Sequence, residues 1–349
     1  MNTVHVKATR EYDVLIGSGL LRTVGSHAAK LKTRKVCIVS DTNVWPLYGD
    51  TVTKSFSDHA IDAVSFVFEA GEQSKNAGTY LQLLNFLAEE ELNRTDLILA
   101  LGGGVVGDLA GFAAATYLRG IPYIQAPTTL LAAVDSSVGG KTAIDLPAGK
   151  NLAGAFCQPH LVLCDTDCLD TLPEDIFRDG CAEVIKYGIL YDPDLISYLA
   201  RKGLDFDRKT VITRCVELKR DVVAEDEFDT GARMMLNLGH TIGHAVEKQS
   251  HFTLSHGKAV AIGMAIVARA GETLSITGRV TKTVILETLK QFGLPLSCSF
   301  TADELYEAAL SDKKRSGDFI NLVIPRFTGD CVIRPMPVDE LKSFIKAGL

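Results

Sequence analysis

The sequence lacks the features that would place it in a membrane or outside the cell. It contains no apolar run of the roughly 18 residues needed to span a bilayer. Its beginning, Met1–His5, has no basic region followed by an apolar stretch, so we expect no secretory signal. None of its eight cysteines forms a C-x-x-C pair, and in a chain of this length without a secretory signal we expect reduced thiols in the cytoplasm rather than a disulfide framework.

An excess of positive charge is also missing, because the 349 residues carry a formal net charge of −7. With its charges spread along the sequence, the chain is not expected to take nucleic acid or an anionic membrane as its main partner. A local basic pocket for a small anion stays compatible with this balance. The chain has no repeat or low-complexity segment, and its length is enough for two domains.

The pattern of predicted elements changes near residue 172. Before it, strand-like runs such as Lys35–Ser40 alternate with helical patterns, which predicts a Rossmann-like α/β domain over residues 1–172. Asp41, which ends that run, either binds a ribose or caps the next helix. Helical periodicity then takes over, so we expect an all-α domain over residues 173–349, with a small hairpin formed by Asp318–Arg326 and Asp330–Arg334.

A glycine-rich turn, Gly102–Asp108, follows a predicted strand and precedes an alanine-rich helix. Gly102, Gly104 and Gly107 fit the G-x-G-x-x-G pattern, whose glycines let the backbone approach a phosphate at a helix N-terminus. The acid expected about 20 residues later is missing, because that region reads Pro122–Thr128. The turn indicates a dinucleotide site, with a glycine-rich packing turn as the alternative.

A second glycine-rich segment, Pro127–Thr142, ends in Gly-Lys-Thr like a nucleotide-hydrolase P-loop. The first glycine of that motif would have to stand where the chain has Asp135, an acid that would repel a triphosphate. We therefore reject the P-loop interpretation. Asp135, Lys141, Lys150 and Asn151 remain as polar groups on a predicted loop, where they either line a site or face the solvent.

Polar side chains recur at helical spacing in the segment Arg233–His244. Arg233, Asn237, His240 and His244 follow steps of four, three and four residues, which would place them within about 60° on one face of a helix. Burying these groups without partners would cost several kcal/mol. We interpret the stripe as the lining of a site, with a solvent-exposed face as the alternative.

Candidate metal ligands come from this stripe and from two other predicted helices. Glu183 and Lys186 share one helical face, either as a surface ion pair or as part of a site. One carboxylate with two imidazoles would form a zinc site that keeps an open position for substrate or water. The imidazoles are those of His240, His244 and His256, and spacing alone leaves open which two of the three bind.

Several cations could neutralise an anionic substrate that carries phosphate and carboxylate. The alternative is that they are ordinary solvated side chains. They are Arg119, Lys141, Lys219, Arg233 and the run Lys313-Lys314-Arg315.

Five segments then stand in one order along the chain: Gly102–Asp108, Pro127–Asp145, Gly149–Asn151, Ala182–Gly188, and Asn237–Ala245 with His256-Gly257. Together they resemble the 3-dehydroquinate synthase family of sugar-phosphate cyclases, over a match from about Asp41 to Pro325. The resemblance implies an NAD-binding α/β domain, a helical domain that carries zinc or cobalt, and a homodimer. It also implies a cytoplasmic lyase of the shikimate pathway of aromatic amino acid biosynthesis.

The resemblance further implies a reaction and a set of site residues. The reaction converts 3-deoxy-D-arabino-heptulosonate 7-phosphate to 3-dehydroquinate and phosphate by transient oxidation with NAD, phosphate elimination, re-reduction and an intramolecular aldol step. Zinc would be held by Glu183, His240 and His256. NAD would contact Asp41, Glu72, Lys75, Gly103, Gly104, Val105, Asp108, Thr128, Thr129, Lys141, Lys150 and Thr171. Substrate binding and catalysis would fall to Asp135, Lys141, Asn151, Lys186, Lys219, Arg233, Asn237 and His244, with a lysine of the Lys313–Lys314 pair.

Within this set, His244 and Lys186 are the candidates for proton handling. Arg119 would extend across the dimer. Asp229 departs from the family pattern, which has a glutamate there, and so shortens one side chain near the basic cluster.

Three other functions compete with this interpretation. A cyclase acting on another sugar phosphate would share most of the motifs, but Arg233 and Lys219 favour a substrate with a carboxylate. An NAD-dependent metal polyol dehydrogenase would share the glycine turn and the metal ligands without needing so many cations. A non-catalytic nucleotide sensor would have no use for an intact set of metal ligands.

Overall fold

The computed structural model describes residues 1–310, 315–316 and 318–349, and the chain folds into two compact units. The first unit contains Met1–Pro173 and Arg208–Phe228, and the second contains Glu174–Asp207 and Asp229–Leu349. The sequence analysis placed every residue after 172 in the second domain. Helix α7 (Arg208–Glu225) instead belongs to the first unit, because its apolar side packs against the sheet there. Periodicity reveals that a helix has an apolar face, but not what that face packs against.

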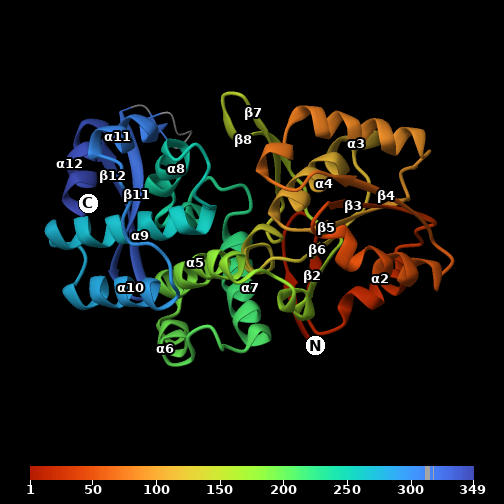
Figure 1. The fold of residues 1–349 in the computed structure, drawn as a ribbon, viewed down its shortest axis with the longest axis horizontal. Helices are drawn as coiled ribbons and strands as arrows, with labels where there is room; N and C mark the ends of the chain where they lie inside the picture. Colours follow the sequence, from red (N-terminus) through yellow and green to blue (C-terminus); the bar gives the residue numbers. More distant parts are fainter. Residues whose placement is uncertain (311–314, 317) are drawn as a thin grey trace. The chain divides into compact units, whose positions relative to one another are not determined.

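A seven-stranded sheet forms the centre of the first unit (Figure 1). In space its strands follow the order β1-β2-β9-β6-β5-β3-β4. Strands β1 and β2 pair antiparallel, and the neighbours from β2 to β4 pair in parallel. The strands are β1 (Asn2–Val6), β2 (Tyr12–Gly17), β3 (Lys35–Asp41), β4 (Asp62–Phe68), β5 (Leu97–Gly102), β6 (Tyr123–Pro127) and β9 (Leu161–Asp165). The predicted Rossmann-like α/β fold is confirmed.

Helices cover both faces of this sheet, and strand β3 shows why. Val36 and Ile38 pack with α1 and α2, whereas Cys37 and Val39 pack with α3 and α4. Side chains alternate between the faces of a strand, so a strand covered on both sides is a continuous apolar run. The four helices are α1 (Val24–Lys30), α2 (Trp45–Ser57), α3 (Ala77–Glu89) and α4 (Gly104–Thr116).

The polar segment predicted as a loop is a two-stranded hairpin, β7 (Lys141–Leu146) and β8 (Gly149–Phe156). Near its turn, Asn151 adopts a φ of 53°, and its N–H donates a hydrogen bond of 2.7 Å to Asp145 Oδ1. The glycines and the proline around this turn resemble loop composition, which hid the short alternating strands from the sequence analysis.

Helix α9 (His256–Thr273) forms the centre of the second unit, where α8 and α10 pack on it from different sides (Figure 1). The predicted helical character and the predicted hairpin are confirmed. The hairpin strands are β11 (Phe319–Phe327) and β12 (Asp330–Pro337), and β11 also pairs with β10 (Arg315–Ser316). The other helices are α5 (Glu174–Tyr191), α6 (Pro193–Lys202), α8 (His240–Gln249), α10 (Arg279–Gln291), α11 (Ala302–Leu310) and α12 (Val338–Gly348).

The single helix predicted across Arg233–His244 is wrong, because the chain turns sharply at Gly239. Residues Ala232–Asn237 form a short 3₁₀ helix, and α8 begins only at His240. Gly239 adopts a φ of 77°, which glycine tolerates best, and a Cβ there would lie 2.7 Å from the carbonyl oxygen of Val260. Arg233 and Asn237 are therefore not on one helical face with the histidines.

Among the described residues, we find no helix with the length and apolar character that crossing a bilayer would require.

Candidate active site

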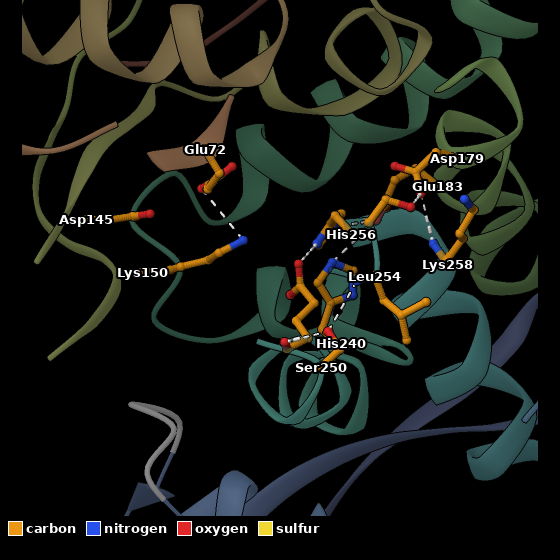
Figure 2. Close-up of polar contacts among 12 residues, drawn as sticks. Glu72, Asp145, Lys150, Asp179, Glu183, His240, Ser250, Leu254, His256 and Lys258 are labelled. Carbon is orange, nitrogen blue, oxygen red and sulfur yellow. Dashed lines mark hydrogen bonds and ion pairs between the residues drawn. The ribbon is translucent and has the colours of Figure 1, made fainter. Parts of the chain in front are cut away.

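One carboxylate and two imidazoles converge in the second unit, each from a different helix. Glu183 lies on α5, and His240 and His256 are the first residues of α8 and α9. Glu183 Oε1 is 3.4 Å from His240 Nε2 and 3.3 Å from His256 Nε2 (Figure 2). Tetrahedral zinc with ligand bonds of about 2.1 Å places its ligand atoms roughly 3.4 Å apart. The three side chains therefore fit a divalent metal such as zinc.

The remaining ring nitrogens of both histidines face acceptors. His240 Nδ1 lies 3.1 Å from the carbonyl oxygen of Leu238, and His256 Nδ1 lies 3.5 Å from Oε1 of Glu247. A proton on each Nδ1 leaves each Nε2 with the lone pair that a metal needs. The structure thus favours His240 and His256 as the metal ligands among the three histidines that spacing left open. A second possible ligand group, His244, Glu247 and His256, shares one histidine with the first.

The electrostatics of this centre favour a positive charge. Burial lowers the pKa of His256, but its hydrogen bonds with Glu183 and Glu247 outweigh burial and raise the pKa to about 10. A divalent ion supplies the positive charge that these carboxylates would otherwise draw from a proton. Lys186, buried one turn along α5, forms an ion pair with Glu183, and its ammonium lies 5.2 Å from the centroid of the Tyr187 ring.

The start of α9, which carries His256, is held by α5. Asp179 Oδ1 accepts hydrogen bonds from Ser255 Oγ at 2.5 Å and from the Lys258 N–H at 2.9 Å (Figure 2). A Cβ at Gly257 would come within 2.0 Å of the Asp179 carbonyl oxygen, so only glycine allows this close approach. These contacts fix the position from which His256 extends toward Glu183.

In the first unit, most of the predicted NAD contacts gather at one edge of the sheet. The parallel strands β3, β5, β6 and β9 are followed by polar or glycine residues where each strand ends. Because carboxyl ends of parallel strands share one edge, these residues lie together where doubly wound folds bind dinucleotides. They are Asp41 at the end of β3, Gly103, Gly104 and Val105 after β5, Thr128 and Thr129 after β6, and Thr171 beyond β9.

The glycines of the turn pack closely against neighbouring side chains along this edge. Gly103 precedes α4 without a side-chain cap, and a Cβ there would lie 3.1 Å from Thr129. A Cβ at Gly104 would lie 3.2 Å from Ser136 Oγ. The missing side chains allow a phosphate group to approach the first turn of α4. Asp41 Oδ1 accepts hydrogen bonds of 2.9 Å from the N–H groups of Asn43 and Val44, so it closes the turn before α2, whose N-cap position is Val44.

A buried lysine organises the acids predicted to contact the cofactor. Lys75 is 4 % exposed, and its ammonium lies 3.0 Å from Glu72 Oε1 and 3.1 Å from Asp108 Oδ2. Lys150 approaches Glu72 at 3.7 Å from the hairpin (Figure 2). Burial raises the pKa of Asp108 to about 6 although the ammonium of Lys75 opposes the shift. The four side chains form one polar cluster rather than separate solvated groups.

The predicted substrate contacts divide between the two units. In the first, Lys219 on α7 binds both the carbonyl oxygen and the carboxylate of Asp135, which lies in a short π-helical turn, Ala132–Ser136. Such turns are rare and occur often at functional sites. In the second, Arg233 is 2 % exposed, and the His244 ring lies 5.5 Å from that of His240.

Three predictions stand apart from these clusters. Lys313 and Lys314 lie outside the described residues. Arg119 is exposed in a turn at the end of α4. Asp229 adopts a φ of 58°, a backbone region in which aspartate is several-fold enriched over most residues.

The sequence analysis missed Glu247. The signal was present, since an acid follows His244 by three residues on a helix whose other side is apolar. At 3 % exposure Glu247 is among the most buried acids of the described chain, and burial of an acid requires a partner that spacing alone did not reveal.

Comparisons with known proteins bear on both units. Residues 65–179 match the family model of the 3-dehydroquinate synthase N-terminal domain, and residues 180–315 match that of the C-terminal domain. A 3-dehydroquinate synthase of Pelobacter propionicus is 46 % identical over 342 residues, covering 95 % of this chain and 94 % of the relative.

Two solved structures have the same fold at lower identity. A 2-deoxy-scyllo-inosose synthase complexed with carbaglucose-6-phosphate, NAD⁺ and Co²⁺ is 26 % identical, with a TM-score of 0.90 and 100 % coverage of both chains. A 2-epi-5-epi-valiolone synthase from Streptomyces hygroscopicus, with NAD⁺ and Zn²⁺ bound, is also 26 % identical, with a TM-score of 0.89 and 98 % coverage of both chains.

The two solved structures are sugar-phosphate cyclases, and the dinucleotide-type sheet edge of one unit and the carboxylate–imidazole centre of the other fit that class. Within that class, the family models and the identity over nearly the full length are decisive. This chain belongs to the 3-dehydroquinate synthase family.

Proposed function

We propose that this chain converts 3-deoxy-D-arabino-heptulosonate 7-phosphate to 3-dehydroquinate and phosphate, with NAD and zinc as cofactors. Membership of the family supports the reaction. The observation that carries the proposal in this chain is the convergence of Glu183, His240 and His256 at the spacing of zinc ligands. A protein that had kept only the fold would be under no constraint to retain these groups.

When bound, NAD would accept and return a hydride, and zinc would lower the pKa of the substrate hydroxyls. Glu183, His240 and His256 would hold the metal, and the glycine turn would admit the pyrophosphate. The wider set of NAD contacts would be Asp41, Glu72, Lys75, Gly103, Gly104, Val105, Asp108, Thr128, Thr129, Lys141, Lys150 and Thr171.

The chain's own cations and amides would hold the substrate in one reactive conformation, which is positioning catalysis. Lys219, Lys141 and Arg233 would balance the charges of the carboxylate and the phosphate. Asp135, Asn151 and Asn237 would bind hydroxyl groups. His244 and Lys186 would hold and move protons, because an imidazole and a buried ammonium beside a carboxylate are suited to that task.

The first experiment follows two signals in one assay. Purified protein is mixed with zinc, a catalytic amount of NAD and the heptulosonate phosphate, while phosphate release and NADH absorbance are recorded together. We expect many phosphates per NAD with no net NADH, because oxidation and re-reduction cancel within each turnover. Stoichiometric NADH, or turnover of a simple polyol alone, would instead assign a dehydrogenase. Absence of both signals would exclude this substrate.

The metal assignment has its own test. His240→Ala should lose both bound zinc and phosphate release, whereas His27→Ala, which removes an imidazole from α1 of the first unit, should keep both. Zinc retained at full stoichiometry in His240→Ala would show that this histidine is not a ligand.

We further propose that the enzyme is a cytoplasmic homodimer and that Arg119 contacts the substrate site of the partner subunit. The eight cysteines, all free thiols, fit a reducing compartment. The exposure of Arg119 leaves its guanidinium accessible to a second copy.

A further inference from the structure

Glu247 is a buried acid that no step of the proposed reaction uses. It lies on α8, seven residues after His240, and is 3 % exposed. An ionised carboxylate in such a place is stable only with a partner of opposite charge or with hydrogen-bond donors. One partner that faces it is the ring of His256, whose Nδ1 lies 3.5 Å from Oε1.

The geometry assigns Glu247 as the positioning residue of the metal centre: it orients His256 through Nδ1, while Nε2 of the same ring faces Glu183 and would bind the metal. This inference rests on the metal assignment made above and adds a residue to it. The imidazole has its two nitrogens on different sides of the ring, and here each nitrogen faces a different carboxylate. A carboxylate behind a ligating histidine fixes its tautomer and makes Nε2 a stronger donor to the metal.

The alternative is that Glu247 is itself a ligand, together with His244 and His256. Two observations oppose this. In that group His256 would have to bind through Nδ1, leaving Nε2 directed at Glu183 without a metal between them. His240, whose Nδ1 already faces the carbonyl oxygen of Leu238, presents its Nε2 to Glu183 and would be left out.

The two histidines are therefore supported differently. A backbone carbonyl faces His240, and no side-chain substitution can remove it. A carboxylate faces His256, and it can be replaced without touching a metal ligand. Substitution of Glu247 can therefore change the affinity for the metal while all three proposed ligands stay in place.

The test measures zinc affinity of the purified apoprotein by competition with a chromophoric chelator, and so needs no turnover. We expect Glu247→Ala to raise the zinc dissociation constant about 10- to 100-fold. Glu247→Gln, which keeps an oxygen able to accept from Nδ1 but has no charge, should show a smaller increase. Glu287→Gln, on an exposed position of α10, is the matched control and should bind zinc like the parent.

Two further measurements separate positioning from ligation and from general damage. In a His256→Ala background, Glu247→Ala should cause no additional loss of affinity, because the ring through which it acts is gone. The visible spectrum of the Co²⁺-loaded Glu247→Ala protein should keep the band intensity of the parent, whereas loss of a ligand changes it.

The inference is overturned by parental zinc affinity in both Glu247 variants, or by a cobalt spectrum of Glu247→Ala that matches His256→Ala. An additional loss in the His256→Ala background would also overturn it. Failure of the parent protein itself to bind zinc would instead contradict the proposed function, so the two failures are distinguishable.

Discussion

Asp108 lies in a partly buried cluster with Lys75, Glu72, Asp145 and Lys150, and it is the acid of this cluster whose pKa is raised furthest. Burial raises its pKa from 3.8 to about 6, against the opposing effect of Lys75. In this range the folded protein binds more protons than the unfolded chain does, so the contribution of this carboxyl to stability falls as pH rises from about 4 to above 6.

Asp108→Asn should remove that dependence. The free energy of unfolding of the variant, minus that of the parent, should increase as the pH rises from 4 to 7.5. For a pKa shift of this size the increase is at most about 3 kcal/mol. Urea unfolding of the apoprotein followed by fluorescence measures it, because the single tryptophan, Trp45, lies in the same unit. A difference between variant and parent that does not change with pH would contradict the assigned pKa.

Lys219 and Asp135 form an ion pair that is mostly shielded from solvent, with side chains 7 % and 19 % exposed. Removing one charge leaves the other with less compensation, so Lys219→Met should destabilise the first unit by about 3 kcal/mol. Adding Asp135→Asn should recover part of that loss, which gives a coupling energy of at least about 1 kcal/mol in a double-mutant cycle.

An exposed pair serves as the matched comparison. Lys54 and Asp58 lie one turn apart at the end of α2, with side chains 75 % and 54 % exposed. The same cycle on this pair should give a coupling energy below about 0.5 kcal/mol, because solvent screens it. Equal coupling in the two cycles would show that burial does not strengthen the Lys219–Asp135 interaction.

At the scale of elements, the metal centre depends on how closely α8 approaches α9. A Cβ at Gly263 in α9 would lie 2.0 Å from the carbonyl oxygen of Gly239, the residue before α8. Gly263→Ala should therefore push apart the helices that carry His240 and His256. We expect a loss of stability of about 1–3 kcal/mol, together with weaker zinc binding.

Zinc titration and thermal unfolding followed by circular dichroism measure both effects. Gly78→Ala is the control, since a Cβ there, at the start of α3, meets only the Asn76 side chain at 3.1 Å and should change stability by less than about 1 kcal/mol. Parental zinc affinity in Gly263→Ala would show that the two helices can separate without moving the ligands.

The elements also show what could be predicted from the sequence. The strand β3 and the glycine turn before α4 were predictable because local patterns determine them: a continuous apolar run and a fixed glycine spacing. The break at Gly239 was not, because an isolated glycine is tolerated within helices, and here its φ of 77° is set by contact with α9. Glu247 was missed for a related reason, since its partner comes from another helix.

At the scale of the whole molecule, Arg119 lies in an unusual stretch of backbone. Leu118 and Arg119 adopt φ values of 50° and 67° in succession, although neither is glycine. Left-handed conformations cost roughly 1 kcal/mol or more for such residues. Both residues are exposed, so their own burial compensates for only part of this strain. A partner subunit that contacts the turn would supply that compensation.

Mixed dimers test whether Arg119 acts across such an interface. Arg119→Ala and His240→Ala should each be inactive alone. In a heterodimer of the two, the Arg119→Ala subunit keeps its metal ligands and receives an intact arginine from its partner, so one site of the two is complete. We therefore expect about half the parental activity per dimer, measured as phosphate release from heterodimers isolated with two different affinity tags. If Arg119 served its own subunit, the heterodimer would contain no complete site. Its inactivity, with the dimer intact by light scattering, would place the arginine within its own chain.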